Sequence, residues 1–203
     1  METIFSIQTP LLSEGRLSTL AESFRTRLAV SLAVLLGAGA VAAVAAIFDP
    51  RLGIPGHAIM RTSLPVLLGL AVVPRRGAGT LMAGSAGLTA LLLKVGGFSG
   101  LSPGSLTSLL AFGPMLDVAM FRARPGWMLH VRCVAAGLAA NGIALAVRLA
   151  GATLGLHPSR HGDLGAFVSY AVVTYAICGA AAGLLGAVVA FRLRPSSGEG
   201  EAA

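Results

Sequence analysis

Residues 28–48 read LAVSLAVLLGAGAVAAVAAIF, a stretch with no charged side chain. An α-helix rises about 1.5 Å per residue and the hydrocarbon core of a bilayer is about 30 Å thick, so a helix of this length crosses a membrane. In water, such a helix would have to bury its whole circumference. The stretch therefore predicts a transmembrane helix.

Five further apolar stretches follow, at 58–73, 77–93, 106–121, 127–149 and 167–191. The chain of 203 residues is 55% apolar and only 11% charged, with a mean hydropathy of +0.83. This balance leaves too little polar surface for a water-soluble fold of this size. We expect an all-α, polytopic integral membrane protein with about six transmembrane helices.

The expected organisation has three parts: a cytoplasmic lead-in at 1–26, a six-helix membrane domain at 27–192, and a disordered tail at 193–203. The lead-in is polar and mixed in charge, and part of it is expected to form an interfacial helix. Cys133 and Cys178 both lie in apolar stretches, which predicts small core residues and no disulfide framework.

Basic residues predict the orientation, because they gather in short connections at one end of the expected helices. These are Arg75, Arg76, Arg122 and Arg124, with Arg192 and Arg194 after the last stretch. The positive-inside rule places such connections in the cytoplasm, so both termini are expected there, in the inner membrane of the cell. The net charge of +7 is thus assigned to topology and not to a nucleic-acid partner, since the arginines form no run interleaved with aromatic residues.

Two of the stretches are short and carry a proline near their middle, Pro65 and Pro114. Proline donates no backbone hydrogen bond, which frees the carbonyls of Arg61 and Leu110. In transporters, such interrupted segments often mark the substrate route. A plain kink is the alternative.

The connections at the other, outer end are longer and rich in glycine, proline and polar residues, at 49–57, 94–105 and 157–163. They are expected either to form a gated pocket or to be ordinary loops. Arg61, Lys94 and Arg148 lie in the same outer half. Convergence of these cations would suit a carboxylate or phosphate ligand, whereas Lys94 and Arg148 can also extend to the membrane surface.

Asp117 is the one acidic residue well inside a predicted span, near Arg122 and Arg124. This position predicts a structural ion pair or a helix contact, with a proton relay as the alternative. His157 and His161 have HxxxH spacing, but Pro158 and Gly162 place them in a loop, so neither a metal site nor a cofactor is predicted.

Catalytic motifs point to no enzyme. Gly97-Phe98-Ser99-Gly100 matches the Gly-x-Ser-Gly of rhomboid intramembrane proteases, but that family needs a histidine on the sixth helix and residues 167–191 contain none. A membrane enzyme using Ser99 with an outer histidine, or Asp117 with nearby arginines for lipid chemistry, stays as one alternative. A structural or assembly protein without a ligand is another.

Ala29, Ala33 and Gly37 lie four residues apart and form a small-residue stripe on the first predicted helix. With about six spans, cytoplasmic ends and a glycine-rich outer loop, residues 28–191 resemble the substrate-binding S component of an energy-coupling factor transporter. Gly179 and Gly183 form a second stripe, and the N-terminal Met-His motif of the nickel and cobalt members is missing.

The resemblance implies that the first stripe docks on a transmembrane coupling subunit, that separate ATPase subunits drive transport, and that outer loops close over a vitamin-sized small molecule. No cofactor is implied. The residues expected to contact the ligand are His57, Arg61, Lys94, Ser99, Ser102, Asn141, Tyr170 and Thr174.

Overall fold

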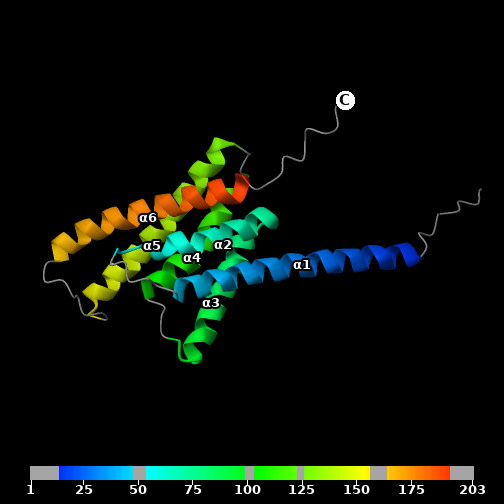
Figure 1. Ribbon diagram of the computed structural model, residues 1–203, viewed down its shortest axis with the longest axis horizontal. Coiled ribbons are helices and arrows are strands. Elements are labelled where there is room, and N and C mark those ends of the chain that lie inside the picture. The colour runs from blue at the N-terminus through cyan, green and yellow to red at the C-terminus, as the bar shows by residue number, and fades with distance from the viewer. Residues whose placement is uncertain (1–13, 48–53, 99–102, 123–125, 156–163, 193–203) are drawn as a thin grey trace, which may run out of the picture. The chain divides into compact units, whose positions relative to one another are not determined.

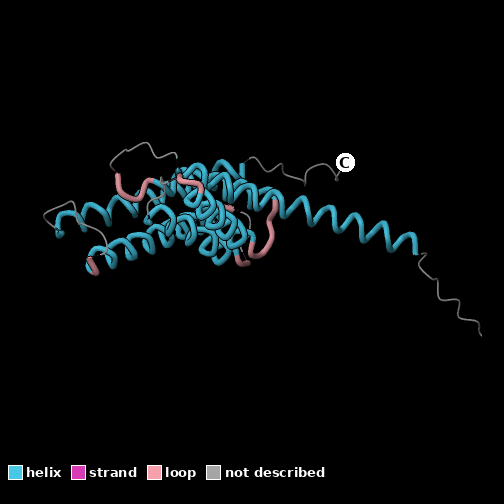
Figure 2. The backbone as a smooth tube through the Cα atoms, turned by 90° about the horizontal axis from the view of Figure 1, so that it is seen from below, coloured by secondary structure: helices cyan, strands magenta, loops and turns pink. Residues whose placement is uncertain are grey.

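The chain is helical throughout the part that the computed structural model describes, residues 14–47, 54–98, 103–122, 126–155 and 164–192. Six helices follow one another (Figure 1): α1 (Glu14–Ile47), α2 (Ala58–Val72), α3 (Ala78–Val95), α4 (Pro103–Met120), α5 (Trp127–Thr153) and α6 (Leu164–Arg192). Figure 2 shows helices and connecting loops and no strand among these residues. Each predicted stretch corresponds to one helix, so the all-α prediction is confirmed.

Among the described residues, four helical segments are long and apolar enough to cross a membrane: Arg25–Ile47, Ala78–Val95, Trp127–Thr153 and Val168–Val189. These segments identify the chain as a membrane protein. The apolar segments of α2 and α4, Ala58–Val72 and Gly104–Met120, are shorter. They are also the two helices with an internal proline, Pro65 and Pro114, as the sequence predicted.

The chain divides into two compact units, with the boundary after Ala33. The first unit holds the first part of α1. This helix begins at Glu14, inside the predicted lead-in at 1–26, and runs without a break into the first predicted span. The second unit holds the rest of α1 and all of α2–α6, and every contact between helices described below lies inside it. The predicted tail, 193–203, lies outside the described residues.

Helix α5 packs against both α4 and α6. Glycines bring the α5 and α6 backbones into direct contact, because a Cβ on Gly137 would overlap the Gly179 carbonyl and a Cβ on Gly183 would overlap the Cys133 carbonyl. Close backbone contact is how helices associate in lipid, where burial of apolar surface gives little driving force. The second small-residue stripe, Gly179 and Gly183, therefore packs against α5.

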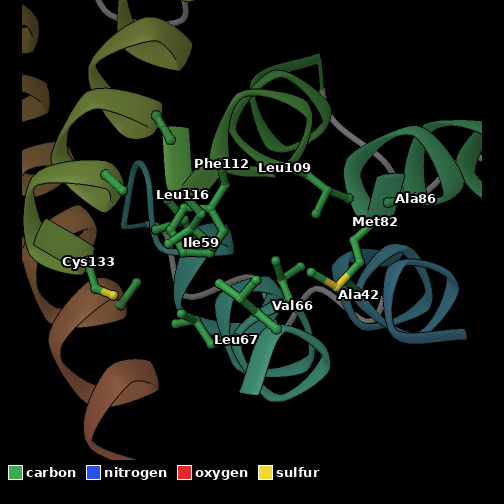
Figure 3. Close-up of a cluster of buried hydrophobic side chains, with 14 of the residues drawn as sticks. Ala42, Ile59, Val66, Leu67, Met82, Ala86, Leu109, Phe112, Leu116 and Cys133 are labelled. Atoms are coloured by element: carbon green, nitrogen blue, oxygen red, sulfur yellow. The ribbon is translucent and has the colours of Figure 1, made fainter. Parts of the chain in front are cut away.

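Helix α4 supplies the largest fully buried side chain of the core, Phe112, which is labelled in Figure 3. Phe112 and Leu116 are fully buried and belong to one cluster with Ile59 of α2, Met82 of α3 and Cys133 of α5. Cys133 and Cys178 are free and buried, which confirms their prediction as small core residues.

Candidate functional site

The first turn of α2 carries a hydrogen-bonded pair of polar side chains. His57, at the N-cap position, has its Nε2 3.3 Å from Nη2 of Arg61, and its Nδ1 is hydrogen bonded to the Ile54 carbonyl. Arginine can only donate, so Nε2 accepts and Nδ1 carries the proton that is donated to Ile54. The pair fixes one tautomer of His57 and holds the half-buried Arg61 guanidinium against the start of the helix.

Asn141 of α5 links this turn to α6. Its Nδ2 donates to the Gly56 carbonyl at 3.2 Å and to the Tyr175 carbonyl at 2.8 Å. Because both partners are acceptors, the amide nitrogen must face them. The Asn141 side-chain amide therefore has a fixed orientation, in which Oδ1 points away from the Gly56 and Tyr175 carbonyls.

The Asn141 side chain is only 1% exposed, and its Oδ1 has no hydrogen-bond partner among the described residues. Leaving a buried acceptor unsatisfied costs about 1–3 kcal/mol. Oδ1 is thus a buried acceptor for which the described residues supply no donor.

Tyr175 forms the packing surface beneath the turn. Gly56 has φ +83°, and a Cβ there would come within 2.9 Å of the Tyr175 ring, so only glycine fits. The Tyr175 hydroxyl lies 3.5 Å from the Cβ position of Gly104, at the start of α4. Tyr175, which is 4% exposed, therefore reaches from α6 to the turn before α2 and to the first residues of α4.

We refer to Gly56, His57, Arg61, Asn141 and Tyr175 as the polar site. Three of the eight predicted ligand-binding residues, His57, Arg61 and Asn141, belong to it. Tyr175 was missed; a phenol in a mostly aliphatic stretch was the available indication, and Thr174 beside it was chosen instead.

The other predicted ligand-binding residues that the structure describes, Lys94, Tyr170 and Thr174, form no hydrogen bond with the polar site. Lys94 is exposed at the end of α3, and Tyr170 is 51% exposed on α6. Thr174 donates to carbonyls of its own helix, those of Tyr170 at 3.0 Å and Ala171 at 3.1 Å. Ser99 and Ser102 lie outside the described residues.

The three predicted docking residues on α1, Ala29, Ala33 and Gly37, are all exposed, and a Cβ on Gly37 would meet nothing within 4 Å. Within the second unit, a neighbouring part of α1 packs on α3. There Ser85 Oγ donates to the Leu36 carbonyl at 2.7 Å, and a Cβ on Gly39 would overlap the Met82 carbonyl.

Asp117 holds the N-terminus of α3. Its Oδ1 accepts from the Gly79 N–H at 2.9 Å, and its Oδ2 accepts from the Thr80 N–H at 2.8 Å and the Thr80 hydroxyl at 2.6 Å. Gly77 occupies the N-cap of α3 and has no side chain to cap the helix, so a carboxylate from α4 takes that role. The predicted helix contact is confirmed, and Asp117 forms no ion pair with Arg122 in the described structure.

Arginines surround the end of α4. Nη1 of Arg132, from α5, donates to the carbonyls of Ala119 at 3.3 Å and Phe121 at 3.0 Å, which satisfies acceptors that the helix end leaves free. The guanidinium carbons of Arg76 and Arg122 lie 5.5 and 5.2 Å from the centre of the Phe121 ring. We call Arg75, Arg76, Phe121 and Arg122 the arginine cluster.

Among the described residues, no three His, Cys, Asp or Glu side chains gather as metal ligands, and His157 and His161 lie outside that part of the chain. No protein family, curated protein or solved structure matches this chain. The apolar helices therefore define the class, an α-helical membrane protein.

Proposed function

We propose that this protein is the membrane-embedded substrate-binding subunit of an uptake transporter, which binds a small polar molecule at the polar site. The observation that carries the proposal is the oriented amide of Asn141, buried in the helical domain with Oδ1 unsatisfied by the described residues. A ligand N–H or O–H at this oxygen would recover the cost of its burial.

The arrangement of charges indicates the class of ligand. The Arg61 guanidinium is hydrogen bonded to His57, one helical turn away on α2. Asn141, which donates to the carbonyl of the neighbouring Gly56, offers its Oδ1 as an acceptor. A guanidinium and a neutral amide acceptor that are linked to neighbouring residues, His57 and Gly56, suit a small molecule that carries a carboxylate or phosphate and also an N–H or O–H donor. Tyr175 adds a flat aromatic surface next to Gly56.

The proposal includes six crossings of the inner membrane, with both termini in the cytoplasm. Asp117 joins the end of α4 to the start of α3, and Arg132 joins the first part of α5 to that same end. Tyr175 lies against the starts of α2 and α4. These contacts support helices that alternate in direction, and the arginine-rich connections would then all lie on one side.

The proposed subunit is not an enzyme and relies on a transmembrane coupling subunit and ATPase subunits. The exposure of Ala29, Ala33 and Gly37 supports a role for this stripe in contacting another membrane helix. The alternative of lipid chemistry at Asp117 is disfavoured because both carboxylate oxygens are engaged at the N-terminus of α3.

Native mass spectrometry of the protein purified from its own host's membranes tests the proposal. We expect a non-covalent adduct of vitamin-sized mass, which Arg61→Gln reduces at least tenfold because a charge-assisted contact of about 1.5–3 kcal/mol is lost. Lys94→Gln removes an exposed positive charge outside the polar site and should retain the adduct.

Thermal unfolding of each variant shows whether it is folded. Wild-type protein that carries only lipid and detergent would contradict the proposal and favour a structural or assembly role. An adduct that survives in a folded Arg61→Gln variant would show that binding occurs elsewhere.

A further inference from the structure

The arginine cluster is an exposed patch of positive charge at the ends of three helices. Arg75, Arg76 and Arg122 are all exposed, and they lie between the end of α2, the start of α3 and the end of α4. Phe121 is 52% exposed, and Trp127, the first residue of α5, is 73% exposed. Exposed aromatic rings next to helix ends are typical of the membrane–water interface.

Phe121 brings two positive charges together. Arg76 and Arg122 both lie within 6 Å of its ring centre, a distance at which a guanidinium is attracted to the aromatic face. Two like charges near one ring repel each other, and an anion that contacts both would reduce that repulsion. The geometry thus favours an anion with several acceptor oxygens.

No acidic side chain of the described residues neutralises the cluster. Asp117 is the one acidic residue in the described part of the second unit, and its oxygens accept hydrogen bonds from Gly79 and Thr80. Arg132 is directed to the backbone carbonyls of α4. Within the described part of the second unit, Arg75, Arg76 and Arg122 therefore have no acidic partner.

We propose that the arginine cluster binds the phosphate of an anionic phospholipid, with Arg76 and Arg122 donating to the phosphate oxygens and Phe121 and Trp127 lying at headgroup depth. A lipid is the partner that the position favours, because the cluster lies where helices of a membrane protein end and the phosphates of the adjacent leaflet begin. The site is separate from the polar site and does not depend on the proposed transport function.

Lipid titration of the purified full-length protein in neutral detergent tests the proposal, with bound lipid counted by native mass spectrometry. We expect phosphatidylglycerol to bind more tightly than phosphatidylethanolamine. The double variant Arg76→Gln/Arg122→Gln should weaken phosphatidylglycerol binding about 25-fold, since each arginine near an anionic surface contributes roughly a factor of five.

The matched control is Lys94→Gln/Arg148→Gln, which removes the same charge from exposed positions at the ends of α3 and α5. It should change phosphatidylglycerol binding less than about twofold, because the arginine cluster is intact. Equal binding of the two lipids, or equal weakening by the two double variants, would overturn the proposal. Displacement of the lipid by equimolar inorganic phosphate would also overturn it and indicate a site for a soluble anion.

Discussion

Replacing Gly137 by leucine should abolish the folded protein, whereas Gly142→Leu on the same helix should leave it folded. A side chain at Gly137 would enter the space occupied by the Gly179 backbone, where the next contact, to the Gly179 carbonyl carbon, is only 3.1 Å from the Cβ position. Overpacking a well-packed core by even small groups costs about 1–3 kcal/mol, and a leucine adds three more carbons than alanine. Separation of α5 from α6 is the expected result.

Gly142 is the control because it is exposed and a Cβ there would meet nothing within 4 Å. Size-exclusion chromatography in detergent measures the outcome. The Gly137→Leu protein should elute as aggregate, and Gly137→Ala should be folded but with a lower unfolding temperature. A monodisperse Gly137→Leu protein as stable as Gly142→Leu would show that α5 and α6 do not meet at this glycine.

Removing the carboxylate of Asp117 should destabilise the protein by about 2–3 kcal/mol, since a charge-assisted hydrogen bond contributes about 1.5–3 kcal/mol and loss of a helix cap costs about 0.5–2 kcal/mol. In Asp117→Ala, the N–H groups of Gly79 and Thr80 lose their acceptor, and Gly77 cannot replace it. The midpoint of unfolding in denaturing detergent is the quantity to measure.

Thr80→Val provides a graded comparison, because it removes only the hydroxyl that donates to Asp117 and leaves both backbone contacts. It should cost about 1 kcal/mol, the net contribution of one ordinary hydrogen bond. Unchanged stability of Asp117→Ala would mean that α3 is not capped by α4. Equal effects of Asp117→Ala and Thr80→Val would mean that the backbone contacts contribute nothing.

The four long spans could be predicted from the sequence because apolar length alone is a sufficient criterion for a membrane-spanning segment, whereas the shorter α2 and α4 do not meet that criterion. The residues at which the helices begin and end were less predictable. The first span was expected to start at Leu28, yet α1 begins at Glu14. A change from apolar to polar composition marks where a helix leaves the lipid and not where the helix ends, so the two boundaries differ.

Part of the polar site was also predictable, because Arg61 and Asn141 are polar residues in apolar stretches, where each needs a partner. The partners were not predictable. Asn141 donates to residues 34 and 85 positions away, and Asp117 accepts from residues 37 and 38 positions away. In a chain with 27 glycines, small residues are not confined to one face, so the sequence does not show which faces meet.

The most direct test of the account is whether the two short helices, α2 and α4, cross the membrane. In a variant with both native cysteines replaced by alanine, single cysteines at Arg75, Phe98, Trp127 and Leu154 can be labelled from one side of sealed vesicles. Six crossings predict that Arg75→Cys and Trp127→Cys label on the same side, with Phe98→Cys and Leu154→Cys on the opposite side. If only the four long segments cross, Arg75→Cys and Trp127→Cys will label from opposite sides, which would contradict the account.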